Sequence, residues 1–248
     1  MPGFARRARL RTRGEPRSAN GASSFHLRWL LPPCPPLTEV AVDLEVRKPP
    51  AVDRLYFWAL QVTFADGGGA HVGLQWNPRH PGCAAVNWGG YAPGGGLLDG
   101  TASALPSAPG DPNTRDYPWV PGATYRLAVG PAPGRAGWWR GSVTDVASGR
   151  TTVVRDLAGG GGELRCPTVW SEVFARCDHP SVAARWSGFE AVTAGGDVVR
   201  PDALAVSYEP GPAGGCDNTT VAADAGGVLQ VTNAGRAVPH GGVVRLTR

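Results

Sequence analysis

Short apolar runs that alternate with polar positions dominate the chain from about residue 24 onward, and Gly, Pro, Asn or Asp closes most of them. In segment 40–46 the four apolar residues share one side of an extended chain, whereas Asp43 and Glu45 fall on the other. This period of two is typical of a half-buried β-strand. The same pattern predicts strands near 25–31, 55–65, 70–76, 84–88, 123–130, 137–146, 151–157, 168–175, 182–193, 198–208, 227–233 and 242–247.

These strands indicate the fold class. The 36 glycines and 24 prolines among 248 residues would interrupt long helices repeatedly. Sandwich folds commonly use about 200 to 250 residues as one unit. We therefore predict an all-β, antiparallel two-sheet β-sandwich of jelly-roll type over residues 24–248, preceded by a disordered basic tail over 1–23. Segment 56–64 is apolar enough for a central strand, and 92–122 is expected to form a long loop.

Positive charge is concentrated at the N-terminus. The net charge is +4, yet the first 17 residues hold six arginines and one glutamate, so the remainder carries a charge of −1. A nearly neutral body offers no broad surface for nucleic acid. No apolar run is long enough for a secretion signal or a membrane span. As written, the sequence predicts a soluble, unexported monomer without nucleic-acid or membrane partners; a misassigned start would leave export open.

Five cysteines are widely spaced and fit no zinc template. One or two disulfides are expected, and we favour Cys177 with Cys216 because each lies beside an aspartate in a polar loop. Oxygen donors in segment 111–116 are of the kind that calcium requires, but Asp, Pro and Asn also form turns. The sequence therefore predicts no metal site and no cofactor.

The block from 67 to 91 carries the most informative polar and aromatic residues. If 70–76 is a strand, His71, Gly73 and Gln75 share one face, and Gly73 leaves a gap that a ligand or an aromatic ring could fill. Planar rings beside amide side chains suit a sugar-binding surface. The alternative is that the tryptophans fill the core and the amides cap turns. The predicted ligand-binding residues are His71, Gln75, Trp76, Asn77, Asn87, Trp88, Tyr91 and Glu172.

Catalytic patterns are weak. Glu172 is a solitary carboxylate, and the acidic residues in 39–45 have the spacing E-x-x-x-D-x-E instead of the E-x-D-x-x-E of sandwich-fold glycosidases. His71, Gln75 and Arg79 offer the residue types of a lyase by composition alone. No serine lies in G-x-S-x-G. No catalytic residue is assigned.

The segment from Tyr56-Phe57-Trp58 to Gly73-Leu74-Gln75, with its glycine turn, resembles a motif of bacterial domains of unknown function. Those domains look like members of the concanavalin-A-like lectin and glucanase superfamily. The resemblance extends more loosely over residues 24–208, through Trp138-Trp139, Trp170-Ser171-Glu172 and Trp186. It implies a jelly roll whose concave sheet faces carbohydrate and lacks the hydrolase carboxylates. The expected function is thus lectin-like and non-catalytic, with a glycan as partner; a polysaccharide-cleaving enzyme and a structural domain without a small ligand are the alternatives.

Overall fold

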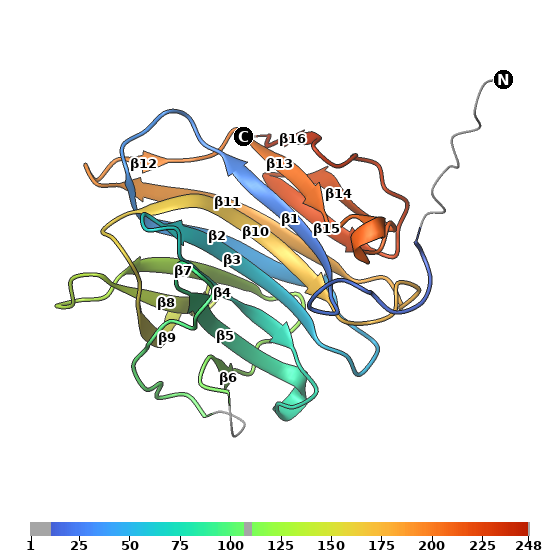
Figure 1. Ribbon diagram of the computed structural model, residues 1–248, viewed down its shortest axis with the longest axis horizontal. Helices are drawn as coiled ribbons and strands as arrows, with labels where there is room; N and C mark the ends of the chain where they lie inside the picture. Colours follow the sequence, from blue (N-terminus) through green and yellow to red (C-terminus); the bar gives the residue numbers. More distant parts are fainter. Residues whose placement is uncertain (1–10, 107–110, 248) are drawn as a thin grey trace.

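The computed structural model describes residues 11–106 and 111–247, and β-strands make up nearly all of their regular structure (Figure 1). No helix in these ranges is long and apolar enough to cross a membrane. The strands are β1 Ser23–Leu30, β2 Leu37–Lys48, β3 Tyr56–Phe64, β4 Gly69–Trp76, β5 Ala84–Tyr91, β6 Thr114–Asp116, β7 Thr124–Pro131, β8 Trp138–Asp145, β9 Arg150–Ala158, β10 Leu164–Val173, β11 Ala183–Thr193, β12 Val198–Val199, β13 Ala203–Tyr208, β14 Thr219–Asp224, β15 Gly227–Thr232 and β16 Val243–Arg245. Two single-turn 3-10 helices, η1 Pro81–Cys83 and η2 Gly211–Ala213, complete them.

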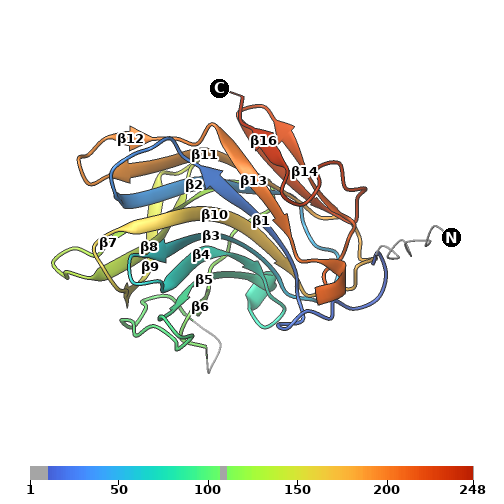
Figure 2. The same ribbon diagram turned by 45° about the horizontal axis from the view of Figure 1, so that its top comes forward.

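The strands form two layers, here named sheet A and sheet B (Figures 1 and 2). Sheet A has the order β16-β13-β1-β10-β3-β4-β5-β6. Sheet B has the order β14-β15-β11-β2-β7-β8-β9, with β12 against β11. One residue pair, Leu164 with Leu37, joins the layers edge to edge. Every pairing is antiparallel, so the predicted all-β two-sheet sandwich of jelly-roll type is confirmed.

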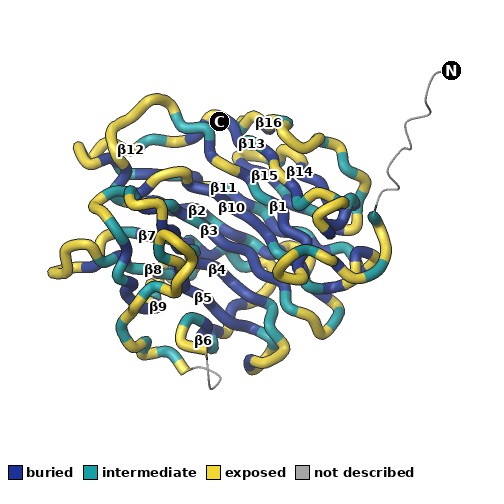
Figure 3. Tube along the Cα trace, viewed as in Figure 1, coloured by how far each residue is buried: buried dark blue, intermediate teal, exposed yellow. Residues whose placement is uncertain are grey.

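The hydrophobic core lies between the two sheets, where the strands are buried and the loops around them exposed (Figure 3). Strand β3 shows how alternation builds it: Tyr56, Trp58 and Leu60 point into the core and are at most 2% exposed. Across the layers, Trp88 of β5 lies over Gly141 of β8, where an added Cβ would come within 2.5 Å of the indole. Glycine at 141 therefore leaves the space that this large ring fills.

Most predicted strands lie within a few residues of the observed ones, and two strands were missed. The short β6 lies inside the expected loop 92–122, because three residues are too few to show a period. Strand β14 begins with two threonines and ends in Ala222-Ala223-Asp224, so its apolar positions do not alternate clearly. Prediction 198–208 is divided into β12 and β13 around Pro201.

The N-terminal segment 11–22 differs from the disordered tail that was expected. The backbone N–H of Arg11 donates to the Asp217 carboxylate. The Gly14 carbonyl accepts from the N–H of Cys177 at 2.8 Å, and the Arg17 N–H donates to the Gly214 carbonyl at 2.9 Å. These bonds attach the segment to loops of the domain, so the ordered part begins well before residue 23. The rest of the predicted tail, residues 1–10, lies outside the described residues.

A disulfide joins Cys177 to Cys216, the pair favoured from the sequence, with Cα atoms 5.5 Å apart. It ties the β10–β11 connection to the segment before β14. Beside it the Asn218 amide donates to the Cys177 carbonyl at 2.7 Å and to Asn233 Oδ1 at 3.0 Å. The disulfide and these bonds hold the loops on which segment 11–22 rests.

Candidate functional site

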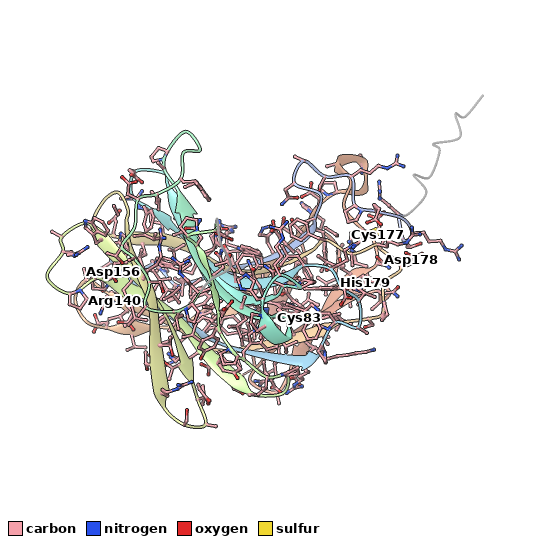
Figure 4. All side chains as sticks on the ribbon, turned by 90° about the horizontal axis from the view of Figure 1, so that it is seen from below. Cys83, Arg140, Asp156, Cys177, Asp178 and His179 are labelled. Atoms are coloured by element: carbon pink, nitrogen blue, oxygen red, sulfur yellow. A yellow bond between two sulfur atoms is a disulfide. The ribbon has the colours of Figure 1, made fainter. Side chains whose placement is uncertain are left out.

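The face of sheet A that points away from sheet B carries the candidate site. In Figure 4 the sheet is bowed, and flanking segments rise on both sides of this face, which we call the concave face. Because the strands pair in register, side chains on it form rows that cross the strands. One row contains Ser24, Glu172, Phe57 and Gln75, the next contains His26, Trp170, Ala59, Gly73 and Asn87, and a third contains Arg28, Thr168, Gln61, His71 and Gly89.

An aromatic cluster occupies the middle of the concave face, with Trp170 at its centre. The Trp170 ring lies 4.8 Å from Phe57, 5.5 Å from His71 and 6.1 Å from His26 between centroids. Its indole N–H donates to Gln61 Oε1 at 3.0 Å. Phe57, Ala59 and Trp170 form an apolar group separate from the main core. The concave face therefore has an apolar floor that polar side chains surround.

Burial changes the titration of both histidines in this cluster. Desolvation lowers the pKa of His71 to about 4, and it also lowers the pKa of His26. His71 packs edge-on against Phe57 and Trp170 without a carboxylate partner among the described residues. Both rings are consequently neutral at neutral pH, and His71 remains so in mildly acidic solution.

A carboxyl group lies beside the aromatic cluster. Glu172 Oε1 accepts hydrogen bonds from Asn20 Nδ2 at 3.0 Å and from Ser24 Oγ at 3.2 Å. Desolvation raises the pKa of Glu172, and the charge of Glu209 raises it further, while the bonds from Ser24 and Asn20 oppose the rise. Glu209 follows β13, where its N–H pairs with the Ser24 carbonyl. Within the described residues no donor reaches Glu172 Oε2, so that oxygen can exchange a proton with a ligand or water.

A polar pocket of about 560 Å³ lies across β3 from Glu172, at the end of β4. Gln75, Asn77, Asn87 and Thr114 supply amide and hydroxyl groups to it. Asn77 Nδ2 donates to Gln75 Oε1 at 2.9 Å, and Asn87 Nδ2 donates to Thr114 Oγ1 at 2.9 Å. The pocket thus contains a fixed set of neutral hydrogen-bonding groups.

Glycine at position 73 is required by the close approach of two strands, and it does not leave the gap for a ligand that was predicted. A Cβ at this position would lie 2.1 Å from the Trp58 carbonyl oxygen and 2.7 Å from the Ala59 Cα. The backbones of β3 and β4 approach too closely for any side chain, so glycine is needed for the strand pairing itself.

The structure divides the predicted ligand-binding residues between the two faces of sheet A. His71, Gln75, Asn87 and Glu172 lie on the concave face, Asn77 lines the polar pocket, and exposed Tyr91 ends β5. Trp76 and Trp88 point the other way: Trp88 is fully buried in the core, and Trp76 packs against it. These two residues are therefore removed from the site, because their even positions in β4 and β5 put them on the core side.

Several residues of the site were not predicted. Counting back two positions from Glu172 places Trp170 on the same face, and the same alternation in β3 separates Phe57 from its core-facing neighbours. Asn20 and Ser24 could not be found from strand periodicity, because Asn20 precedes β1 and the prediction placed it in a disordered tail. Sequence reasoning therefore missed Asn20 and Ser24, which contact Glu172 only through packing between segments far apart in the chain.

Two histidines that precede prolines in loops, His80 and His179, are buried. The His80 ring contacts the Asp116 carboxylate at 2.6 Å, and the His179 ring contacts the Tyr56 hydroxyl at 3.0 Å. Each is satisfied by one protein partner. Over residues 11–106 and 111–247, no group of three or more His, Cys, Asp or Glu side chains could hold a metal ion.

Comparison with known proteins gives distant structural likenesses only. No family model matches the chain, and no curated protein sequence matches it. A crystal structure of scytalido-glutamic peptidase with a peptide-based transition-state analog superposes with a TM-score of 0.48 at 9% identity, covering 85% of this chain and 98% of that chain. SCP-B, a member of the eqolisin family of peptidases in complex with the tripeptide Ala-Ile-His, gives 0.47 at 8% identity, covering 85% and 98%. Likeness at this level does not carry an argument about activity.

The predicted lectin-like, carbohydrate-binding function is wrong. Trp88, the flat ring on which a sugar was to stack, lies in the core with none of its surface exposed. Neither of the two solved structures named above is a lectin or a polysaccharide-cleaving enzyme. Any function must therefore be derived from the concave face as it is built.

Proposed function

We propose that the protein is a peptidase that binds an extended polypeptide on the concave face and uses Glu172 as its acid–base residue. The observation that supports this proposal most directly is the environment of the Glu172 carboxyl group. It stands beside an apolar floor, one oxygen is held by two donors, and the other is free of protein donors in the described chain. Burial and the neighbouring Glu209 raise the pKa of Glu172. A carboxyl group that must first accept a proton and then return it works best when its pKa is close to the pH of the reaction.

Glu172 can supply both proton transfers that peptide-bond hydrolysis requires. The ionised Glu172 Oε2 takes a proton from water while the water oxygen attacks the amide carbon. The resulting carboxylic acid then gives that proton to the departing nitrogen, so that water is divided between a new carboxylate and a new amine. Apolar surroundings raise the pKa of a carboxyl group and lower that of an amine, so they bring the pKa values of Glu172 and of the leaving amine closer together than in bulk water. Asn20 and Ser24 hold the carboxyl in one orientation throughout.

The concave face also fits an extended chain. Its rows follow strand spacing, so a ligand that crosses the strands meets a new side chain about every 4.8 Å. The aromatic cluster can receive apolar side chains, and the polar pocket can receive hydrogen-bonding ones. The structure of the eqolisin peptidase named above is a complex with a tripeptide. That complex is consistent with a peptide ligand here, but the proposal rests on this chain's own residues.

Digestion of an unfolded polypeptide between pH 3 and 8, read by mass spectrometry, tests the proposal. The wild type should produce defined fragments, and Glu172→Gln should slow cleavage by about 10²- to 10⁴-fold, the usual contribution of a general acid–base residue. Glu39→Gln is the matched control, because Glu39 is exposed on β2 in sheet B. Intact substrate at every pH, or equal cleavage by wild type and Glu172→Gln, would eliminate Glu172 as the reacting group.

The acid limb of the activity profile gives a second test. Ser24→Ala removes a hydrogen bond that stabilises the carboxylate form, so it should raise the pKa of Glu172 further. Because the first step needs the ionised form, the acid limb should move to higher pH while the maximal rate changes less. An unshifted limb would mean that another group sets it.

A further inference from the structure

The polar pocket contains two amide side chains whose hydrogen-bonding atoms are incompletely used. Asn87 is more than nine-tenths buried, and its Oδ1 has no hydrogen-bond partner in the described chain. A buried acceptor left unpaired costs about 1–3 kcal/mol, so such atoms usually have a partner. None of the bonds of Gln75 within the described residues uses its Nε2, because Oε1 accepts from Asn77 and the main-chain carbonyl accepts from Trp119.

The orientation of the Asn87 amide is set by its neighbours. Its Nδ2 donates to Thr114 Oγ1 at 2.9 Å, and the Thr114 main-chain N–H donates to Asp111 Oδ1 at 3.3 Å. The hydroxyl oxygen of Thr114 has lone pairs that accept from this amide N–H. The amide nitrogen therefore faces Thr114, and the unpaired oxygen is the one left on the other side.

The two unused atoms have opposite roles. Gln75 pairs with Ala85 on β5, two positions before Asn87, so the two side chains are diagonal neighbours on the concave face. Gln75 Nε2 offers a donor and Asn87 Oδ1 an acceptor. A carboxamide carries the complementary pair, because its carbonyl accepts and its N–H donates. Apolar Leu55 and Phe174 line the same pocket and can cover the carbon atoms of such a ligand.

We infer that the polar pocket binds a carboxamide group of the polypeptide ligand, with the ligand carbonyl on Gln75 Nε2 and the ligand N–H on Asn87 Oδ1. This inference rests on the proposed function only in taking a polypeptide as ligand. The charged residues of the lining, Asp53 and Asp111 with Arg54 and Arg79, balance in sign, so their net charge selects neither a carboxylate nor an ammonium group.

Calorimetric binding of short peptides to the full chain tests the inference without requiring cleavage. The probes are acetyl-Ala-Xaa-Ala dimethylamides with Gln, Glu or Met at Xaa, so that only Xaa carries a primary carboxamide. The Glu172→Gln variant is used to prevent turnover. The Gln peptide should bind about tenfold more tightly than the Met and Glu peptides, which corresponds to the loss of one or two hydrogen bonds.

Substitutions then locate the contact. Asn87→Leu should abolish the preference for Gln, and Gln75→Met should weaken it, with thermal melts to verify that each variant folds. Glu39→Met is the control, because Glu39 is an exposed polar residue on β2 in sheet B, away from the concave face. If Gln and Met peptides bind equally and both are lost in Asn87→Leu, a main-chain amide is the bound carboxamide.

Two outcomes would overturn the inference: tightest binding of the Glu peptide, or peptide binding that neither Asn87→Leu nor Gln75→Met alters. Binding without any cleavage by the wild type would contradict the peptidase proposal and leave the carboxamide site standing. Cleavage by the wild type together with peptide binding that neither pocket variant alters would do the reverse.

Discussion

The two faces of sheet A are made by the same strands and differ in almost every other respect. On the core side, β3 presents Tyr56 and Trp58 to a layer of apolar side chains from sheet B. On the concave side, the intervening Phe57 and its neighbour Trp170 lie among histidines, amides and a carboxyl group. One strand thus contributes to stability with its even positions and to a candidate site with its odd ones.

Two tryptophans show what this difference means physically. Trp88 is enclosed by both sheets, and its indole N–H has no acceptor in the described chain. Trp170 is nearly as buried, yet its N–H is bonded to Gln61 and its ring is surrounded by other rings. Burial alone therefore does not distinguish a core tryptophan from a site tryptophan. The distinction lies in whether the second sheet covers the ring and in whether the indole N–H has a hydrogen-bond partner.

The largest expected effect comes from the core side. Trp88→Ala should lower the free energy of unfolding by about 3–5 kcal/mol, because the rigid layers cannot close over the cavity. Urea denaturation followed by tryptophan fluorescence measures it. A loss below that of Trp170→Ala would break the distinction between the faces.

An intermediate effect is expected on the concave side. Trp170→Ala should cost about 1–3 kcal/mol, since water can enter the space and Gln61 can turn toward it. Its effect on peptide binding should be larger than that of Trp88→Ala in variants that remain folded. Equal binding by wild type and Trp170→Ala would show that the aromatic cluster is not part of the ligand surface.

A pH-dependent effect also distinguishes the concave side from the core side. The unfolded chain protonates His71 near 6.5, whereas the folded chain does so near 4, so protonation stabilises the unfolded state between these values. Wild-type stability should therefore fall as pH decreases from 6.5 to 4. His71→Phe removes this contribution, and its melting temperature relative to wild type should increase over that window. His240→Gln, at an exposed residue before β16, is the control; a constant difference for His71→Phe would contradict the low pKa.

Much of the fold could be predicted from the sequence because strand alternation is local. The apolar positions in 40–46 needed no partner to reveal a half-buried strand, and β2 extends over them. The same reasoning failed for Trp88, because alternation indicates that two faces exist without indicating which one the other sheet covers. In a strand with large apolar residues on both faces, that choice depends on tertiary packing.

The candidate site was only partly within reach of sequence reasoning. His71, Gln75 and Glu172 were singled out by residue type, and register places the last two in one row across β10, β3 and β4. The raised pKa of Glu172 could not be predicted, since it depends on burial and on Glu209, 37 positions along the chain. The contribution of Asn20 required segment 11–22 to be docked against the domain.

The hydrogen bonds of Asn218 have a consequence for production of the protein. Asn218-Thr219-Thr220 is a consensus acceptor for N-linked glycosylation, which attaches sugar to the side-chain nitrogen. In the folded chain that nitrogen donates to the Cys177 carbonyl and to Asn233 and lies in a nearly closed site. An oligosaccharide could be attached only before folding, and a modified chain, whose side-chain nitrogen keeps one N–H, could not restore both bonds. In a eukaryotic secretory host, the fraction of chains glycosylated at Asn218 would thus equal the fraction that was modified before folding. Expression in a bacterial host without N-linked glycosylation avoids these modified chains.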